Sequence, residues 1–223
     1  MSWSYRDRNH AGHVLSEELG KIDYGSDPLV LAIPNGGVAV ALPIAESLKA
    51  DLDVIIVRKM QIPHNPEAGF GSLTSLGTMI LNDALVKRIG LNEDDIRRVR
   101  SRTEKQIEER KMAYADLAGI FHPGGRNVIL VDDGLASGYT MLAAIQSIRE
   151  SKPAGIMVAV PTSSSSAASR IRAEVDQFIC PRVESGFVFA VANAYENWYD
   201  APDDEVIDAL ARARRQDGFD PPH

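Results

Sequence analysis

The feature that most constrains this fold is a short apolar segment that ends in two carboxylates and continues into a glycine-rich turn. Residues 128–131 are apolar, Asp132 and Asp133 follow, and the turn opens a helical stretch near Thr140. A continuous apolar run of this length is typical of a strand buried on both faces of a parallel sheet. The two acids are then expected at the carboxyl edge of the sheet, where ligands bind in open α/β folds.

The same alternation of strand, turn and helix recurs along most of the chain. Apolar runs predict strands at residues 29–33, 53–57, 127–131, 155–160, 177–180 and 187–192. Periodic or capped stretches predict helices at residues 6–21, 37–49, 140–150, 167–174 and 203–214. This order predicts an α/β fold with a parallel sheet and helices on both faces. The length of 223 residues suits one domain, 1–223.

Residues 60–126 differ in character and are interpreted as an insertion with room for a flexible loop. The pattern predicts a hairpin over residues 70–81, a short helix capped by Asn82 and a long helix capped by Asn92. Between residues 93 and 111 that helix carries six acids and seven bases. It is expected to be either a solvated helix with ion pairs such as Glu93 with Arg97, or a mobile arm over a site or against a partner chain.

Composition narrows the classes of function. The chain has 24 basic and 31 acidic residues, a net charge of −7, which argues against a nucleic-acid binder. Cys180 is the single cysteine, so no intramolecular disulfide can form and a cytoplasmic, reducing location is expected. The sequence contains no apolar run near the ~20 residues that a membrane span needs, and its first ten residues contain no apolar signal core.

The turn after the acid pair has the chemistry of a phosphate site. Small residues that open a helix direct several backbone N–H groups at one point, and Ser137 and Thr140 add hydroxyls. The carboxylates of Asp132 and Asp133 would accept hydrogen bonds from neutral hydroxyls or bind a cation. Phosphate beside vicinal hydroxyls describes a ribose 5-phosphate. The turn lacks the lysine of a Walker loop and the glycine spacing of a dinucleotide fold.

Residues 128–140 resemble the signature with which type I phosphoribosyltransferases bind 5-phosphoribosyl-1-diphosphate (PRPP). Residues 29–37 look like that family's first strand and diphosphate loop, and Arg58-Lys59 before Pro63 resembles adenine phosphoribosyltransferases. The whole chain is most similar to the group called predicted phosphoribosyltransferases. This resemblance implies a type I phosphoribosyltransferase fold with a small hood.

The resemblance also implies an enzyme of nucleotide salvage. It would use Mg²⁺ to transfer ribose 5-phosphate from PRPP to a nitrogenous base or another nucleophile, with release of diphosphate. Its partners would be PRPP, a small-molecule acceptor and a second copy in a homodimer, without nucleic acid or membrane. The alternative is a regulator that binds PRPP or a nucleotide without turnover. A mobile loop that excludes water favours the enzyme, and residues 60–126 are long enough for one.

Site residues follow from the resemblance and from the chemistry of each position. The expected PRPP-binding residues are Asn35, Gly36, Gly37, Arg58, Lys59, Asp132, Asp133, Gly134, Ala136, Ser137, Gly138, Tyr139 and Thr140. Asp132 and Asp133 would act on the ribose hydroxyls directly or as ligands of Mg²⁺, whereas Arg58 and Lys59 would bind diphosphate or cap a solvated strand end. Glu67 is a candidate catalytic acid or base.

Three further expectations concern neighbouring residues. Ala136 occupies the turn position where many members carry an acid, which weighs against the hypoxanthine-guanine type. The bond Asn35–Gly36 is expected to be trans or mixed without ligand and to become a non-proline cis peptide, as in the resembling enzymes, with PRPP and Mg²⁺ bound. The alternative is an ordinary tight turn. The aromatic side chains of Tyr195, Trp198 and Tyr199 would form a base-stacking hood or pack in the core.

Overall fold

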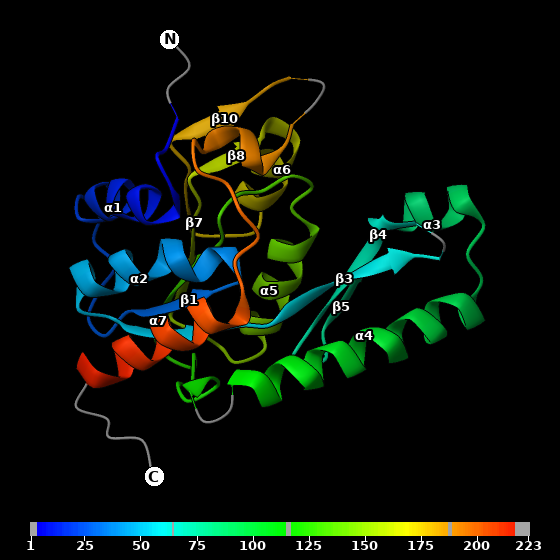
Figure 1. Ribbon diagram of the computed structural model, residues 1–223, viewed down its shortest axis with the longest axis horizontal. Helices are drawn as coiled ribbons and strands as arrows, with labels where there is room; N and C mark the ends of the chain where they lie inside the picture. Colours follow the sequence, from blue (N-terminus) through cyan, green and yellow to red (C-terminus); the bar gives the residue numbers. More distant parts are fainter. Residues whose placement is uncertain (1–3, 64, 115–116, 187–188, 217–223) are drawn as a thin grey trace.

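The computed structural model describes residues 4–63, 65–114, 117–186 and 189–216. Its centre is a parallel sheet of five strands in the order β2-β1-β6-β7-β9 (Figure 1). In that order the strands are Asp51–Val54, Leu29–Ala32, Asn127–Val131, Gly155–Ala159 and Gln177–Ile179. The sequence prediction of an α/β fold with a parallel sheet is confirmed.

Helices cover both faces of this sheet. One face carries α1 (Arg8–Leu19), α2 (Gly36–Leu48) and α7 (Asp203–Gln216). The other face carries α5 (Tyr139–Arg149) and α6 (Ser165–Arg172). Because successive strand residues point to opposite faces, Val30 and Ile129 join the first core whereas Leu31 and Leu130 join the second. Continuous apolar strands therefore position the sheet between two helical layers.

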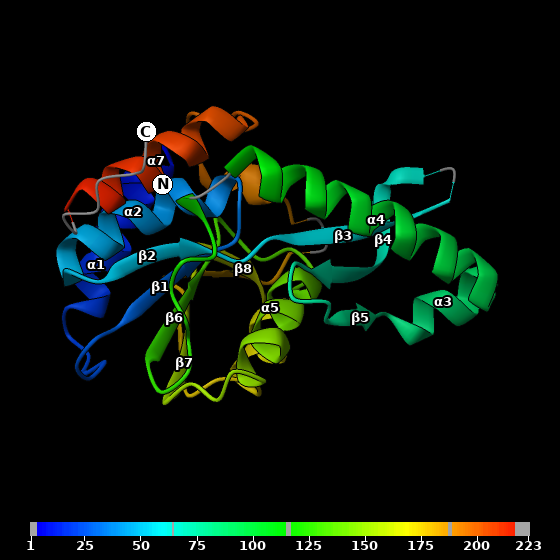
Figure 2. The ribbon, with the colours of Figure 1, turned by 90° about the horizontal axis from the view of Figure 1, so that it is seen from below.

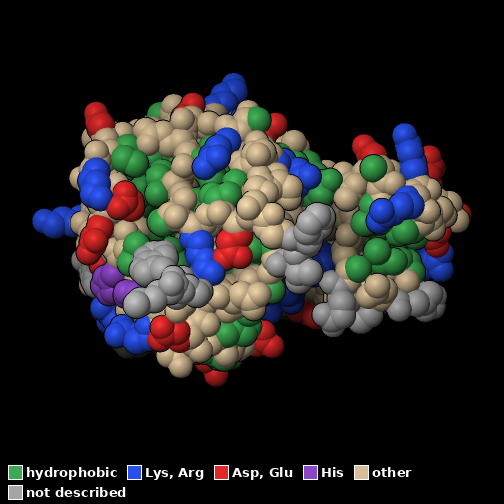
Figure 3. Space-filling model, turned by 90° about the horizontal axis from the view of Figure 1, so that it is seen from above, with side chains coloured by type: hydrophobic (Ala, Val, Ile, Leu, Met, Phe, Trp, Pro, Cys, Tyr) green, Lys and Arg blue, Asp and Glu red, His purple; other side chains and the backbone are tan. Residues whose placement is uncertain are grey.

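Residues 57–114 form an arm that projects from one side of the body (Figures 1 and 2). Its antiparallel sheet has β3 (Val57–Ile62), β4 (Asn65–Thr74) and β5 (Met79–Leu81), followed by α3 (Asp83–Ile89) and α4 (Glu93–Tyr114). Figure 3 shows the arm as a separate lobe with hydrophobic side chains gathered on its surface.

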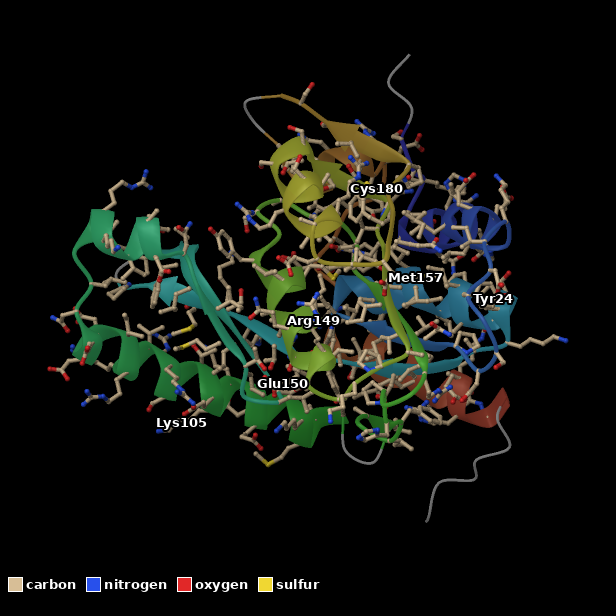
Figure 4. All side chains as sticks on the ribbon, turned by 180° about the vertical axis from the view of Figure 1, so that it is seen from behind. Tyr24, Lys105, Arg149, Glu150, Met157 and Cys180 are labelled. Carbon is tan, nitrogen blue, oxygen red and sulfur yellow. The ribbon has the colours of Figure 1, made fainter. Side chains whose placement is uncertain are left out.

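The long helix α4 is mostly solvated, and its buried residues are Thr103, Ile107 and Tyr114. Lys105 is exposed and lies on the side away from the arm's sheet (Figure 4). The described ion pair of Arg97 is with Asp94 at 3.4 Å, in place of the expected pair with Glu93. The expectation of a solvated helix is confirmed. A mobile arm over a site or against a partner chain stays a prediction.

The expected strand 53–57 is wrong at its carboxyl end. Its backbone N–H at Ile55 still donates to Ala32 O of the central sheet, whereas Ile56 O accepts from Ser75 N of the arm. The chain changes sheets between these two residues, so that Arg58 lies in β3 of the arm. The sequence could not show this change, because the residues before and after it, 54–57, are all apolar.

The expected strand 187–192 is also not found. Residues 187 and 188 lie outside the described part, and Val191–Ala194 form the 3₁₀ helix η2. Val191 and Ala194 pack against Tyr5 in a small cluster of their own, which explains why the apolar pattern there does not produce a strand. A two-stranded parallel sheet of β8 (Thr162–Ser164) and β10 (Arg182–Glu184) lies nearby.

Within the described ranges, none of the helices combines the length and the apolar character that crossing a membrane requires.

Candidate functional site

The two loops predicted to bind PRPP meet at the carboxyl edge of the central sheet. Strands β1 and β6 are parallel neighbours with Ala32 opposite Val131, so the loops that follow them lie side by side. Ile33 N donates to Val131 O at 2.8 Å and extends this pairing into the loops. A Cβ on Gly37 would lie 2.9 Å from Val131 O, so glycine permits this close approach.

The acid pair lies at this edge and is partly buried. Asp133 N donates to Asp132 Oδ1 at 2.8 Å, and Asp133 Oδ2 accepts from Arg8 Nε at 2.8 Å. Burial and the neighbouring Asp133 carboxylate raise the pKa of Asp132 well above its ordinary value. Burial also raises the pKa of Asp133, against the lowering effect of the Arg8 guanidinium. A hydrogen-bond donor or a cation placed here would stabilise the charged carboxylates.

The turn after the acids is held against β8. Leu135 N donates to Thr162 O at 2.9 Å, and Ser164 Oγ donates to Ala136 O at 2.7 Å. Gly138 has a φ of 78° and caps α5, and no side chain of the described residues bonds the first amides of that helix. N–H groups without a side-chain cap and the positive end of a helix dipole are both favourable to an anion at this turn.

The loop after β1 is tied to the arm and to α7 through Asn35. Its Nδ2 donates to Asp203 Oδ1 at 2.9 Å, and its Oδ1 accepts from Arg110 Nη1 of α4. Arg110 also pairs with Asp203 at 3.2 Å. The loop contains a non-proline cis peptide at Pro34–Asn35, one bond before the bond expected to switch. A cis Asn35–Gly36 bond in the complex with PRPP and Mg²⁺ stays a prediction.

The two cationic side chains predicted to bind diphosphate, Arg58 and Lys59, point in different directions in the structure. Arg58 lies near Arg110, and its Nε is buried with no hydrogen-bond partner among the described residues. Burial, followed by repulsion from Arg110, lowers the pKa of Arg58. Lys59 points to the other face of β3, where its methylenes cover Gly69, and lines a groove of about 560 Å³ between β3 and α4. The structure thus brings Arg58 and not Lys59 towards the loop of Asn35.

The remaining predicted residues lie in different surroundings. Glu67 lies in β4 of the arm, and its side chain is outside the described part of the structure. Tyr195 is a core residue, 6% exposed, whose hydroxyl donates to Asp133 O at 2.6 Å. Trp198 and Tyr199 are 39% and 46% exposed and cover the guanidinium of Arg8. The aromatic cluster therefore contains one core residue and two partly exposed rings, and their role as a base-stacking hood stays a prediction.

Sequence reasoning missed two residues that contact the candidate site, Arg8 and Arg110. Arg8 is 5% exposed and contacts the acid pair, whereas Arg110 contacts the loop of Asn35. A signal was present, because each arginine lies on the apolar stripe of its helix. The stripe of α1 also contains Ala11, Leu15 and Leu19, and the stripe of α4 also contains Thr103, Ile107 and Tyr114.

Known proteins resemble this chain over most of its length. A family model described as "Phosphoribosyl transferase domain" matches residues 8–195. Two Mycobacterium tuberculosis proteins, "Putative phosphoribosyl transferase MT0597" (strain CDC 1551 / Oshkosh) and "Putative phosphoribosyl transferase Rv0571c" (strain ATCC 25618 / H37Rv), are each 34% identical over 95% of this chain. The chain spans about half, 47%, of the length of these two relatives.

A solved structure resembles the fold along almost the whole chain. The crystal structure of TT1426 from Thermus thermophilus aligns with a TM-score of 0.78 at 32% identity, covering 94% of this chain and 98% of that chain. The arrangement of sheet, helices and arm is therefore shared with a related protein.

Proposed function

This chain belongs to the phosphoribosyl transferase domain family, and we propose that it transfers ribose 5-phosphate from PRPP to a nitrogenous base or another nucleophile, with release of diphosphate. One observation carries this proposal. The acid pair, the amide-rich start of α5 and the loop after β1 converge at one edge of the sheet. These are the three parts that a phosphorylated ribose with a diphosphate leaving group would need.

Each part has a distinct task in the proposed reaction. The amides and hydroxyls of residues 136–140 would hold the 5-phosphate, because they open helix α5 without a side-chain cap among the described residues. Asp132 and Asp133 would accept hydrogen bonds from the ribose hydroxyls. Gly36 and Gly37 would let diphosphate approach the backbone, and Arg58 would supply positive charge beside it.

The carboxylates of Asp132 and Asp133 suit a magnesium ion that binds together with the phosphates of the substrate. Asp132 and Asp133 are adjacent carboxylates, and no cluster of three or more metal-binding side chains occurs within the described ranges. Mg²⁺ commonly binds through one or two carboxylates together with substrate phosphates and water. Asp132 and Asp133 would hold it, and it would neutralise negative charge on the leaving diphosphate.

The catalytic acid or base is part of the proposal. Ala136 has no titratable side chain, so this position of the turn cannot supply one. Glu67 in β4 of the arm stays our candidate from the sequence, and it would have to reach the site by a movement of the arm. The acceptor, the cytoplasmic location, the role in salvage and the homodimer stay predictions.

The proposal is tested by diphosphate release from PRPP and Mg²⁺ with a panel of purine and pyrimidine bases. Release that depends on one base, and that is lost in the Asp132→Asn/Asp133→Asn double variant, would support transfer. Calorimetric binding of PRPP without release on any base would favour the regulator instead. A folded protein that does not bind PRPP at all would contradict both.

A further inference from the structure

The beginning of the described chain is paired with residues 194–197, and the hydroxyl of Tyr195 in that segment donates to Asp133 O of the acid pair. Tyr5 N donates to Ala194 O and Glu196 N donates to Tyr5 O, each at 2.8 Å. Asn197 N donates to Arg6 O at 2.9 Å, and the Tyr5 hydroxyl donates to Pro161 O at 2.9 Å. These bonds fix the position of the first turn of α1 relative to the sheet edge.

Arg8 extends from this fixed turn to the acid pair. Its Nε donates to Asp133 Oδ2 at 2.8 Å and its Nη1 donates to Tyr199 O at 2.9 Å. Its guanidinium carbon lies 4.1 Å from the centre of the Trp198 ring. We propose that Arg8 is a positioning residue, which holds the Asp133 carboxylate in the orientation that PRPP requires. The inference rests on the proposed function.

The contacts of Arg8 explain why it would act through Asp133 and not on the ligand itself. One edge of the guanidinium is bonded to a carboxylate, another is bonded to a backbone carbonyl, and one flat face is covered by Trp198. The side chain is 6% exposed. A planar group held on three sides fixes the direction of its partner, because its N–H groups form a rigid fork.

Charge gives a second reason for this arrangement. PRPP carries several negative charges, so an isolated pair of carboxylates at the binding edge would repel it. Arg8 offsets one of the two charges of Asp132 and Asp133 at close range, and leaves the remaining oxygens to accept hydrogen bonds. A lysine could supply the same charge, but it could not make the two directed contacts with Asp133 and Tyr199.

The test is a double-mutant cycle on PRPP affinity, measured by calorimetry with Mg²⁺ in the full chain. Arg8→Met and Asp133→Asn should each weaken binding about tenfold, because each removes the oriented charge-assisted contact. The double variant should bind within about twofold of Asp133→Asn alone, since coupled residues lose the same interaction once. Arg8→Lys should bind PRPP with an affinity between those of the wild type and Arg8→Met.

Arg6→Gln is the matched control, because Arg6 is two residues away and its side chain is 65% exposed. Its PRPP affinity should equal that of the wild type, and thermal unfolding should show that every variant is folded. If Arg8→Met does not fold, Arg8→Lys takes its place in the cycle. Additive losses, or wild-type affinity in the Arg8 variant, would overturn the inference alone. A wild-type protein that does not bind PRPP would overturn the proposed function as well.

Discussion

Replacing Gly36 with alanine should damage the site while leaving the fold intact. Gly36 is the first residue of α2, and its missing side chain faces the ion pair of Arg8 and Asp133. An added Cβ would lie 1.9 Å from Asp133 Oδ2 and 2.8 Å from Arg8 Nε. The backbone φ of Gly36 is not in the left-handed region, so alanine is strained only by these side-chain atoms.

The size of the effect follows from these distances. Ordinary contact begins near 3.4 Å, so the carboxylate oxygen must retreat by about 1.5 Å. Such a shift removes a hydrogen bond between charged groups, which is worth about 1.5–3 kcal/mol. We therefore expect the KM for PRPP to rise about 10- to 100-fold. Alanine in place of glycine in a helix offsets up to about 1 kcal/mol of this loss, which leaves a net destabilisation of about 0.5–3 kcal/mol. The unfolding midpoint should therefore fall by about 1–12 °C, and the protein should stay folded at the assay temperature.

The assay is the initial rate of diphosphate release against PRPP concentration, with thermal unfolding measured on the same preparation. Gly20→Ala is the matched control, because a Cβ there meets Ser16 O at 3.4 Å and Gly20 has a helical φ of −60°. The control should keep the wild-type KM. A folded Gly36→Ala protein with an unchanged KM for PRPP would refute the reasoning, because it would show that the Asp133 carboxylate can move without consequence.

Three other predictions test the rest of the site. Changing Asp132 and Asp133 together to Asn should weaken PRPP binding tenfold or more with little change in the unfolding midpoint, and unchanged calorimetric affinity would contradict their assignment. Arg110→Met should raise the KM for PRPP several-fold, whereas Lys105→Met, on the exposed side of the same helix (Figure 4), should not; equal effects would remove Arg110 from the site. Burial raises the pKa of Cys180 to about 12, so its neutral thiol should persist at pH 8 and react slowly with a disulfide reagent until the pH approaches that value; rapid labelling at pH 8 would contradict this.

Continuous apolar strands and helix caps could be predicted closely from the sequence. The strand predicted at residues 127–131 is β6, with the same bounds. Asn82 accepts from Leu85 N at 3.1 Å and Asn92 accepts from Asp95 N at 2.9 Å, as the capping pattern predicted. These features are local or repeat along the chain, so a single sequence contains the information that determines them.

The features that could not be predicted depend on which segment, distant in the sequence, packs against the residues concerned. Residues 55–57 are apolar whether the chain continues in the central sheet or enters the arm. The direction of Arg58 and Lys59 depends on that choice, because neighbouring strand residues point to opposite faces. The position of the cis peptide at Pro34–Asn35 is likewise a matter of how the loop meets its surroundings.

For buried arginines, the sequence predicts that the side chain is buried but not which residue it contacts. Arg8, Arg110 and Arg214 each lie on the apolar stripe of a helix, and a charge there must find a partner when the stripe is buried. The pattern alone does not name the partner: Arg8 reaches Asp133, 125 residues away, and Arg110 reaches Asn35, 75 residues away.

The partner of each arginine differs between Arg214 and the two arginines at the candidate site. Arg214 donates to the backbone carbonyls of Leu52 and Leu117, and so joins α7 to β2 and to the chain beyond α4. Arg8 and Arg110 instead reach the two loops that follow β6 and β1, at the edge where parallel sheets bind ligands. Since α1 and the arm lie outside residues 128–140, the candidate site has contacts with elements that this motif does not contain. A substitution of Arg8 or Arg110 should therefore change PRPP binding although every residue of the motif is intact.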